Sequence, residues 1–149
     1  MKNLILAFAA TCIALPALAE EKKLELTGND QMQFSTKALE VTAGDTVVLT
    51  FKHIGKLPKA AMGHNFVLLK AGTAIPAFAT KAMKATTTDY VPEDEESKKQ
   101  VIAHTKLLGG GETETLTFTA PAEAGAYPFV CTFPGHFALM SGVLTVKAK

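Results

Sequence analysis

Apolar and polar residues alternate over several short segments of the chain, as expected for β-strands that bury one face. The clearest segment is 47–52, where Val47, Leu49 and Phe51 alternate with more polar neighbours. Similar short alternations or apolar runs occur at 24–26, 31–34, 65–69, 116–118, 127–131 and 143–146. Turn residues at 43–45 and 109–111 separate some of them. This pattern predicts an all-β fold, an antiparallel β-sandwich or barrel.

The middle of the chain follows a different pattern. Between residues 72 and 100 the alternation gives way to an Ala/Lys/Thr-rich piece and then to the acidic run 92–96. Segment 77–85 places Phe78, Ala82 and Ala85 on one side of a predicted short helix. We interpret the acidic run as a solvated loop. No repeat or linker divides the chain, so residues 20–149 are expected to form a single domain.

The N-terminal residues have the pattern of a secretory signal peptide. Lys2 precedes an apolar run over residues 4–15, and Ala17-Leu18-Ala19 fits a cleavage site. We therefore expect residues 1–19 to be removed and the mature protein to be periplasmic. Lipoprotein processing at Cys12 is an alternative that residues 9–11 fit poorly. The apolar run is too short to span a bilayer, so no stable membrane insertion is expected.

Composition narrows the function further. Fifteen lysines face 14 acids, giving a net charge of +1, which argues against nucleic acid as a partner. The chain has two cysteines, which excludes a disulfide-rich scaffold and a four-thiolate metal site. Removal of residues 1–19 leaves Cys131 as the one thiol. In an oxidising compartment such a thiol is buried and inert, bound to a metal, or reactive.

The segment 131–140 contains three potential metal ligands. Cys131, His136 and Met140 supply a thiolate, an imidazole and a thioether, and His64 lies far upstream. Two histidines and a cysteine in a trigonal array, with a weak axial methionine, form a blue-copper electron-transfer site. The spacing therefore predicts one bound copper ion.

Other interpretations of these residues remain. Each potential ligand, taken alone, is more often a structural residue. A second hypothesis makes Cys131 the nucleophile of a hydrolase, with His64, His104 or His136 as its base. Pro134-Gly135 argue against the helix N-terminus that such a cysteine often uses. A zinc site is the third, although structural zinc is not expected to select a thioether.

Four parts of the chain resemble the azurins, the bacterial branch of the cupredoxin family: 28–34, 57–59 with 62–65, 101–107 and 131–140. The resemblance implies an eight-stranded Greek-key sandwich with a short helical flap outside it. It also implies a monomeric electron carrier, not an enzyme, that cycles one type 1 copper between Cu(I) and Cu(II). A copper-delivery protein is the alternative from another class. Copper transfer to an apo-acceptor would distinguish the two.

The resemblance also implies roles for individual residues. It assigns His64, Cys131 and His136 as equatorial ligands, Met140 as the long axial ligand, and the carbonyl of Gly63 as the opposite axial contact. Asn65 and Thr132 would tie the two ligand segments together. His53 corresponds to a buried histidine beside the first ligand, which is either a packed residue or a pH-linked switch.

An apolar docking face around His136 is implied as well. Its partners would be redox proteins such as c-type cytochromes or periplasmic reductases and dehydrogenases. Its residues would be Met32, Leu57, Ala61, Met62, Met83, Phe133, Pro134, Phe137 and Leu139.

The sequence departs from the family pattern at several positions. Lys22 and Gly44 occupy the places of the usual disulfide, whose loss is expected to cost about 2–4 kcal/mol of stability. Phe66 replaces a common tryptophan and should keep an aromatic core contact. Phe137 follows the ligand histidine, where relatives often have a smaller residue, and is expected to cover the copper loop or to affect partner choice.

Overall fold

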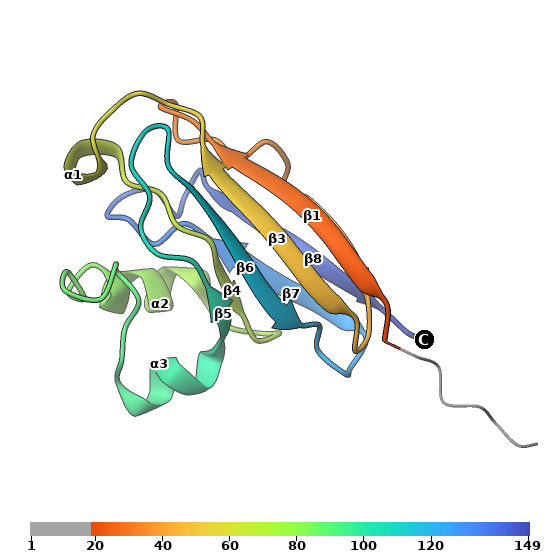
Figure 1. Cartoon of the computed structure of the whole chain (residues 1–149). Helices are drawn as coiled ribbons and strands as arrows, with labels where there is room; N and C mark the ends of the chain where they lie inside the picture. The colour runs from red at the N-terminus through yellow and green to blue at the C-terminus, as the bar shows by residue number, and fades with distance from the viewer. Residues whose placement is uncertain (1–18) are drawn as a thin grey trace, which may run out of the picture.

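The computed structural model describes residues 19–149 and contains two β-sheets packed face to face (Figure 1). The signal-peptide prediction falls on residues 1–19, of which only Ala19 is described. One sheet has the order β1-β3-β6 and the other β2-β8-β7-β4-β5. The all-β sandwich is thus confirmed, with eight strands in the described part of the chain. Their bounds are β1 Glu21–Gly28, β2 Ala38–Thr42, β3 Thr46–His53, β4 Val67–Leu69, β5 Val101–His104, β6 Thr113–Thr119, β7 Gly125–Val130 and β8 Ser141–Lys147.

The direction of strand pairing differs from the prediction. β3 pairs with β6, β4 with β5 and β7, and β7 with β8, all antiparallel. β1 runs parallel to β3, however, and β2 runs parallel to β8 with Ala38 beside Val143. The antiparallel pairing expected from the sequence is therefore present in four of the six strand pairs, and the other two pairs are parallel. Alternation identifies a half-buried strand, but it contains no information on the direction of the neighbouring strand.

The core lies between the two sheets and follows from the alternation. The inward residues of β3, Val47, Leu49 and Phe51, are all 0% exposed. Phe66 is buried and its ring centroid lies 5.3 Å from that of Phe129, in the tilted arrangement common in protein interiors. The predicted aromatic contact of Phe66 is thus present. The sandwich holds the loops at one of its ends on a rigid base.

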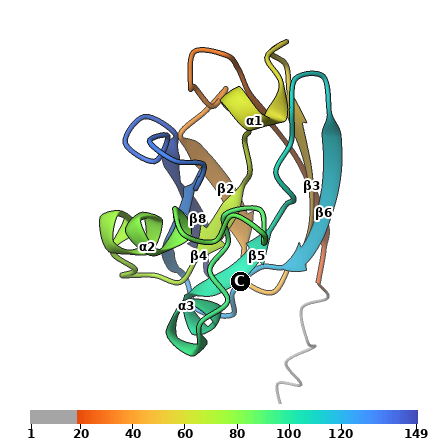
Figure 2. The same ribbon diagram turned by 90° about the vertical axis from the view of Figure 1, so that its left-hand side faces the viewer.

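Two helices form a flap outside the sandwich, between β4 and β5, as Figures 1 and 2 show. The predicted helix 77–85 begins earlier and ends earlier, as α2 (Ile75–Ala82). Pro76 stands in its first turn, where the missing N–H costs nothing. Phe78 and Ala82 are buried as predicted, whereas Ala85 lies beyond the helix. A third helix, α1 (Lys59–Met62), is one turn long and precedes the first ligand segment.

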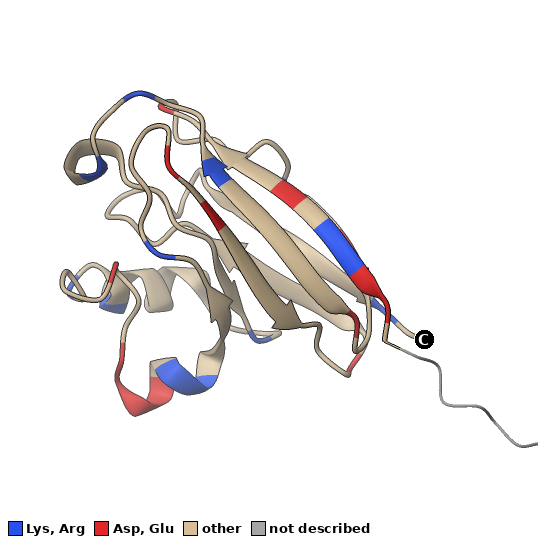
Figure 3. Ribbon diagram, viewed as in Figure 1, with Lys and Arg blue, Asp and Glu red and all other residues tan. Residues whose placement is uncertain are grey.

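The loop prediction for the acidic run 92–96 is wrong in its second half. Helix α3 spans Glu95–Gln100, and the side chain of Asp94 accepts a hydrogen bond from the backbone N–H of Ser97 (3.1 Å). Acidic residues are favourable in the first turn because the helix dipole is positive there. Lys81 of α2 pairs with Glu96 at 2.6 Å and so links the two flap helices. Figure 3 shows acidic and basic segments following each other along α3.

The predicted strand at 31–34 is also wrong. Only Phe34 forms an isolated bridge, to Gly28. The side-chain oxygen of Asn29 accepts hydrogen bonds from the backbone N–H groups of Gln31 and Gln33, and this bends the chain. Met32 takes the left-handed φ of 55° in this turn. Among residues 19–149, no helix is long and apolar enough to cross a membrane.

Candidate metal centre

Two loops at one end of the sandwich carry the predicted ligands. His64 lies between α1 and β4, and its N–H and C=O groups exchange hydrogen bonds with Leu108 at 2.9 and 2.7 Å. The loop from β7 to β8 begins with Cys131 and ends with Met140. A bond from the Cys131 N–H to the Met140 carbonyl (2.9 Å) closes this loop. Both segments are therefore fixed by the backbone before any metal binds.

The structure brings one sulfur and two ring nitrogens together. Cys131 Sγ lies 3.8 Å from His64 Nδ1 and 3.7 Å from His136 Nδ1, and the two nitrogens are 3.2 Å apart. All three residues are buried, with exposures of 0% for Cys131 and His64 and 4% for His136. The centre of this triangle is about 2.1 Å from each atom, close to metal–nitrogen and metal–sulfur bond lengths.

The ring of His64 is oriented by its second nitrogen. Its Nε2 lies 2.8 Å from the carbonyl oxygen of Asn29, so Nε2 carries the proton and donates it. The Nδ1 atom is left with a lone pair that faces Cys131 and His136. Orientation of this kind is typical of histidines that bind metals.

His53 packs against the other side of this ligand. The two rings are stacked, with centroids 4.3 Å apart and planes inclined by 22°. His53 Nε2 donates to the carbonyl of Met62 (2.7 Å), and the N–H of Gly55 donates to His53 Nδ1 (3.1 Å). Both ring nitrogens of His53 thus take part in hydrogen bonds within the protein, one as donor and one as acceptor. The pH-switch hypothesis for His53 stays a prediction.

The donor set fits a soft or borderline cation. Burial raises the pKa of the Cys131 thiol to about 12. Burial, followed by the neighbouring His64 and His53, lowers the pKa of His136 to about 4. The metal-free site therefore holds a neutral thiol and neutral imidazoles at pH 7, and a cation would displace the thiol proton. A deeply buried thiol with a raised pKa is unsuited to the hydrolase hypothesis, which needs an accessible thiolate.

These pKa shifts predict how the stability of the metal-free protein depends on pH. The unfolded chain protonates His136 below about pH 6.5, whereas the folded chain does so only near pH 4. The free energy of unfolding should therefore decrease as the pH is lowered from about 6.5 to about 4. The unfolded chain ionises Cys131 above about pH 9.0 and the folded chain near 12, so stability also falls above pH 9.0. Urea unfolding at a series of pH values should give a free energy of unfolding that is constant between pH 6.5 and 9.0 and decreases on the acidic and on the alkaline side. Cys131→Ser should remove only the decrease on the alkaline side.

The two predicted axial donors lie beside the triangle. Met140 is fully buried in the same apolar cluster as Cys131. The carbonyl oxygen of Gly63 is 4.0 Å from Cys131 Sγ. Sequence reasoning missed a role for Gly28, where a Cβ atom would lie 2.9 Å from His64 Cδ2 and 3.3 Å from the Met140 methyl group. Only a glycine lets the backbone of β1 approach both side chains.

Asn65 connects the two ligand loops and the flap. Its Oδ1 accepts from the Thr132 N–H and its Nδ2 donates to Thr132 Oγ1, both at 2.8 Å. The same Nδ2 donates to the carbonyl of Asp89 in the loop between α2 and α3 (2.9 Å). The sequence does not predict this role of Asp89, because every residue has a backbone carbonyl and the residue type therefore does not reveal the contact. Each loop is thus held in register with the other.

The predicted docking residues differ in exposure. Leu57, Met83 and Leu139 are 42%, 42% and 50% exposed. The remaining members are the exposed Ala61 and the half-buried Met32, Met62, Phe133, Pro134 and Phe137. His136, at 4% exposed, lies just beneath this surface instead of reaching through it.

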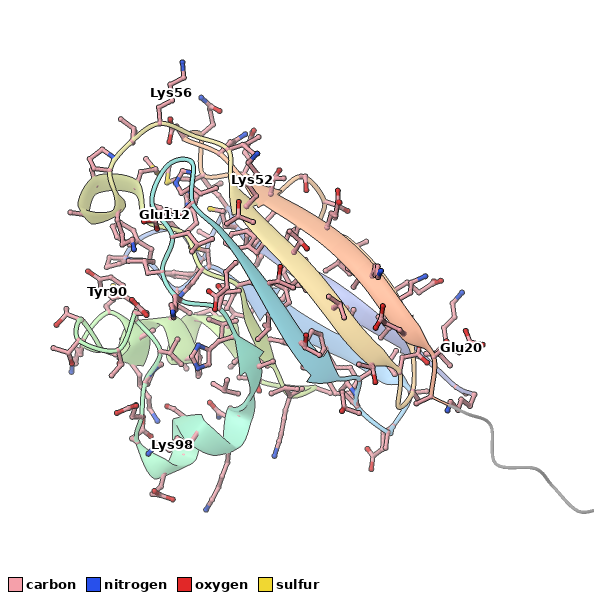
Figure 4. The ribbon with its side chains drawn as sticks, in the orientation of Figure 1. Glu20, Lys52, Lys56, Tyr90, Lys98 and Glu112 are labelled. Atoms are coloured by element: carbon pink, nitrogen blue, oxygen red, sulfur yellow. The ribbon has the colours of Figure 1, made fainter. Side chains whose placement is uncertain are left out.

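Aromatic side chains near His136 link its loop to the flap. The Phe133 ring lies 4.7 Å from the His136 ring, and Tyr90 packs edge-on against Phe133 at 5.3 Å. Figure 4 shows Tyr90 in the flap, on the side of the molecule that carries α2. Phe137 packs against the apolar cluster that contains Phe78 of α2 and Val130 of β7. Phe137 therefore anchors the ligand loop to the flap.

A β-sandwich with a buried Cys-His-His triangle between loops at one end defines a mononuclear metal protein of the cupredoxin class. The sequence profile of the family described as copper binding proteins, plastocyanin/azurin family, matches residues 20–147. The chain belongs to this family.

Individual relatives agree with this assignment. The chain is 41% identical over 138 residues to azurin from Pseudomonas aeruginosa, with 91% of each chain covered. It is 48% identical over 120 residues to outer membrane protein H.8 from Neisseria gonorrhoeae, which covers 79% of this chain and 63% of that protein. The crystal structure of reduced auracyanin from Roseiflexus castenholzii gives a TM-score of 0.74 at 36% identity, covering 86% of this chain and 98% of that one. Membership implies a copper-binding electron-transfer protein.

Proposed function

We propose that the protein is a periplasmic, monomeric one-electron carrier with a single type 1 copper. His64, Cys131 and His136 would hold the ion through one sulfur and two imidazole nitrogens, and Met140 and the carbonyl of Gly63 would add weaker contacts. The observation that supports this proposal best is the buried triangle of one sulfur and two imidazole nitrogens. Thiolate and thioether favour Cu(I), whereas imidazole also suits Cu(II), so the set is matched fully to neither state.

Copper bound there supplies a one-electron couple, and the surrounding residues keep its environment constant. The Asn29 carbonyl holds the ring of His64, and Asn65 holds the loop that starts at Cys131. Phe133 and Phe137 pack the loop around His136 and limit the access of water. A site that moves little between its two charge states has a low reorganisation cost, which favours fast electron exchange.

The geometry favours a carrier over an enzyme or a delivery protein. With one thiolate, two imidazoles, a thioether and a carbonyl as donors, a bound copper ion would have no position left for a substrate. Cys131 and Met140 are fully buried, which hinders the ligand exchange that would transfer Cu(I) to an acceptor. We expect the copper-loaded protein to retain its metal in the presence of an apo-acceptor and to exchange electrons rapidly with a redox protein.

The test is to add Cu(II) to the purified protein and to record the visible spectrum. A thiolate–copper centre gives an intense absorption, which should disappear on reduction and return on oxidation. Voltammetry should show one reversible one-electron wave. A weak spectrum without a thiolate band, or an irreversible wave, would contradict the proposed function.

The docking face around His136 is part of the proposal, with c-type cytochromes or periplasmic reductases and dehydrogenases as partners. A charge at Met62, which is half-buried in α1, should slow electron exchange about tenfold because it places a carboxylate in an apolar contact. The visible spectrum of Met62→Glu should stay almost unaltered. Stopped-flow exchange with a c-type cytochrome measures the effect. Val143→Glu is the control, since Val143 is 40% exposed on β8 outside the face; equal rates in Met62→Glu and the parent would place the contact elsewhere.

A further inference from the structure

The charges of the chain are unevenly distributed along its sequence. Segment 46–88 contains six lysines and no acidic residue, although the whole chain is nearly neutral. The same segment supplies His64 and four members of the proposed docking face, Leu57, Ala61, Met62 and Met83. One side of the face is therefore built from a stretch of chain that carries only positive charge.

Three of these lysines are unpaired and lie near the face. Among the ion pairs of the described residues, Lys59 pairs with Glu112 and Lys81 with Asp94 and Glu96, but none involves Lys52, Lys56 or Lys84. Lys56 projects from the tip of the loop that follows β3, and Lys52 lies at the end of that strand (Figure 4). Lys84 lies just after α2. The loop 131–140 lies between α1 and α2 in both ribbon views.

The carboxylates at this end are engaged within the protein. Asp30 accepts hydrogen bonds from the backbone N–H groups of Lys56 (2.7 Å) and Leu57 (3.4 Å). These bonds, with that of Lys56 first, lower the pKa of Asp30. Glu112 accepts from the Gly109 N–H and binds Lys59, and Glu114 accepts from the Lys106 N–H. Asp89, the acid nearest to Lys84 along the chain, is half-buried and takes part in no ion pair of the described residues. Lys52, Lys56 and Lys84 are exposed and equally without an ion pair, so three ammonium groups stand against this one carboxylate.

Exposed apolar side chains stand next to these lysines. Lys56 lies between Ile54 and Leu57, which are 52% and 42% exposed, and Lys84 follows Met83, which is 42% exposed. An apolar centre with a charged rim is the usual anatomy of a specific interface. Ile54 extends the apolar surface toward the tip, beyond the residues that the sequence resemblance implies.

We infer that the redox partner is an acidic protein whose carboxylates face Lys52, Lys56 and Lys84 around an apolar contact. This inference rests on the proposed function and names the chemistry of its partner. Complementary charges steer diffusional encounter and raise the association rate at low salt. A partner with a basic contact surface would be repelled by the same lysines.

The experiment measures electron exchange of the copper-loaded protein by stopped flow, with an acidic c-type cytochrome and with a basic one. With the acidic cytochrome, the second-order rate constant should fall about tenfold as the ionic strength rises from about 10 mM to about 150 mM, because the Debye length shrinks from about 30 to about 8 Å. With the basic cytochrome it should stay constant or rise. The opposite pattern, or no salt dependence with either protein, would overturn the inference.

Charge reversal at single lysines locates the effect. Lys56→Glu and Lys84→Glu should each slow exchange with the acidic cytochrome at least about threefold at low salt. Lys70→Glu is the matched control: Lys70 comes from the same acid-free segment and is absent from the ion pairs, but it follows the end of β4 remote from His64. Equal slowing by all three variants would show a mere effect of net charge and would overturn the inference.

A lipid surface is the competing explanation for exposed lysines beside apolar residues. Sedimentation with vesicles of phosphatidylglycerol tests it: binding lost in Lys56→Glu, with exchange rates unchanged, would assign these lysines to a membrane and overturn the inference. Throughout, the visible spectrum and the voltammetric wave report on the proposed function separately. If they are normal and the salt dependence is absent, only the acidic partner is refuted.

Discussion

Replacing Cys131 with serine should abolish the intense visible absorption of the copper-loaded protein. The serine hydroxyl does not ionise near pH 7 and is a hard donor, so it supplies neither the charge-transfer band nor the affinity of a thiolate for Cu(I). Since loss of a residue that merely orients a ligand costs about 10–100-fold in metal affinity, loss of this ligand should cost at least about 100-fold. Visible spectroscopy and a competition titration with a Cu(I) chelator measure the two effects.

A comparison with Met140→Leu separates this result from a general packing defect. Both side chains are fully buried in the same cluster, but the thioether of Met140 would be only a weak ligand of the copper. Met140→Leu conserves volume, so it should keep the thiolate band and alter the reduction potential. Retention of the band in Cys131→Ser would exclude Cys131 as a ligand. Circular dichroism on both metal-free variants checks that they fold.

Asn65→Leu should be the most destabilising single substitution near the site. Leucine has the branched shape and the number of side-chain heavy atoms of asparagine, but it leaves the Thr132 N–H, the Thr132 hydroxyl and the Asp89 carbonyl without their partner. Each buried polar group left unpaired costs about 1–3 kcal/mol, so the loss of three partners should lower the free energy of unfolding by at least about 3 kcal/mol. Urea unfolding of the metal-free protein measures the loss, and the spectrum of the copper-loaded variant should also change.

Thr132→Val is the matched control for this substitution. It removes the bond between Asn65 Nδ2 and the Thr132 hydroxyl while the Thr132 N–H keeps its acceptor, so it should cost only about 1 kcal/mol. In the double variant the losses should be less than additive because the two side chains share one bond. Additive losses, or equal losses in the two single variants, would show that Asn65 does not connect the loops.

The strands that could be predicted are those whose alternation meets no local competitor. β3 and β6 show their inward faces plainly. The predicted strands do not include β2, although Leu39 and Val41 are buried and alternate with more polar neighbours. At 31–34 the alternation misled, because the Asn29 side chain bonds to two backbone N–H groups and turns the chain. Helix α3 has no apolar periodicity because most of its residues are charged, so the sequence pattern does not predict it. Asp94 at its start and the lysines in its last turn are nevertheless residues typical of helix ends.

The residues of the candidate site were easier to find than the contacts that hold them. A thiol, two imidazoles and a thioether are distinctive by type and spacing, so His64, Cys131, His136 and Met140 could be named from the sequence. The Asn29 and Asp89 carbonyls act through backbone atoms, and Gly28 acts through the absence of a side chain. Such roles depend on which segments of the chain lie next to each other in the fold, and the pattern of neighbouring residues in the sequence does not contain that information.

The parallel pairing of β2 with β8 sets an order of events during biosynthesis. Ala38 lies beside Val143, and β8 is the one neighbour of β2 in its sheet, so β2 waits for about 105 further residues before it can pair. β8 begins directly after Met140. Strand β8, which completes the sheet, and the loop 131–140, which completes the set of metal ligands, are thus synthesised one directly after the other. We therefore expect copper to enter after the polypeptide has folded, and not to bind the nascent chain.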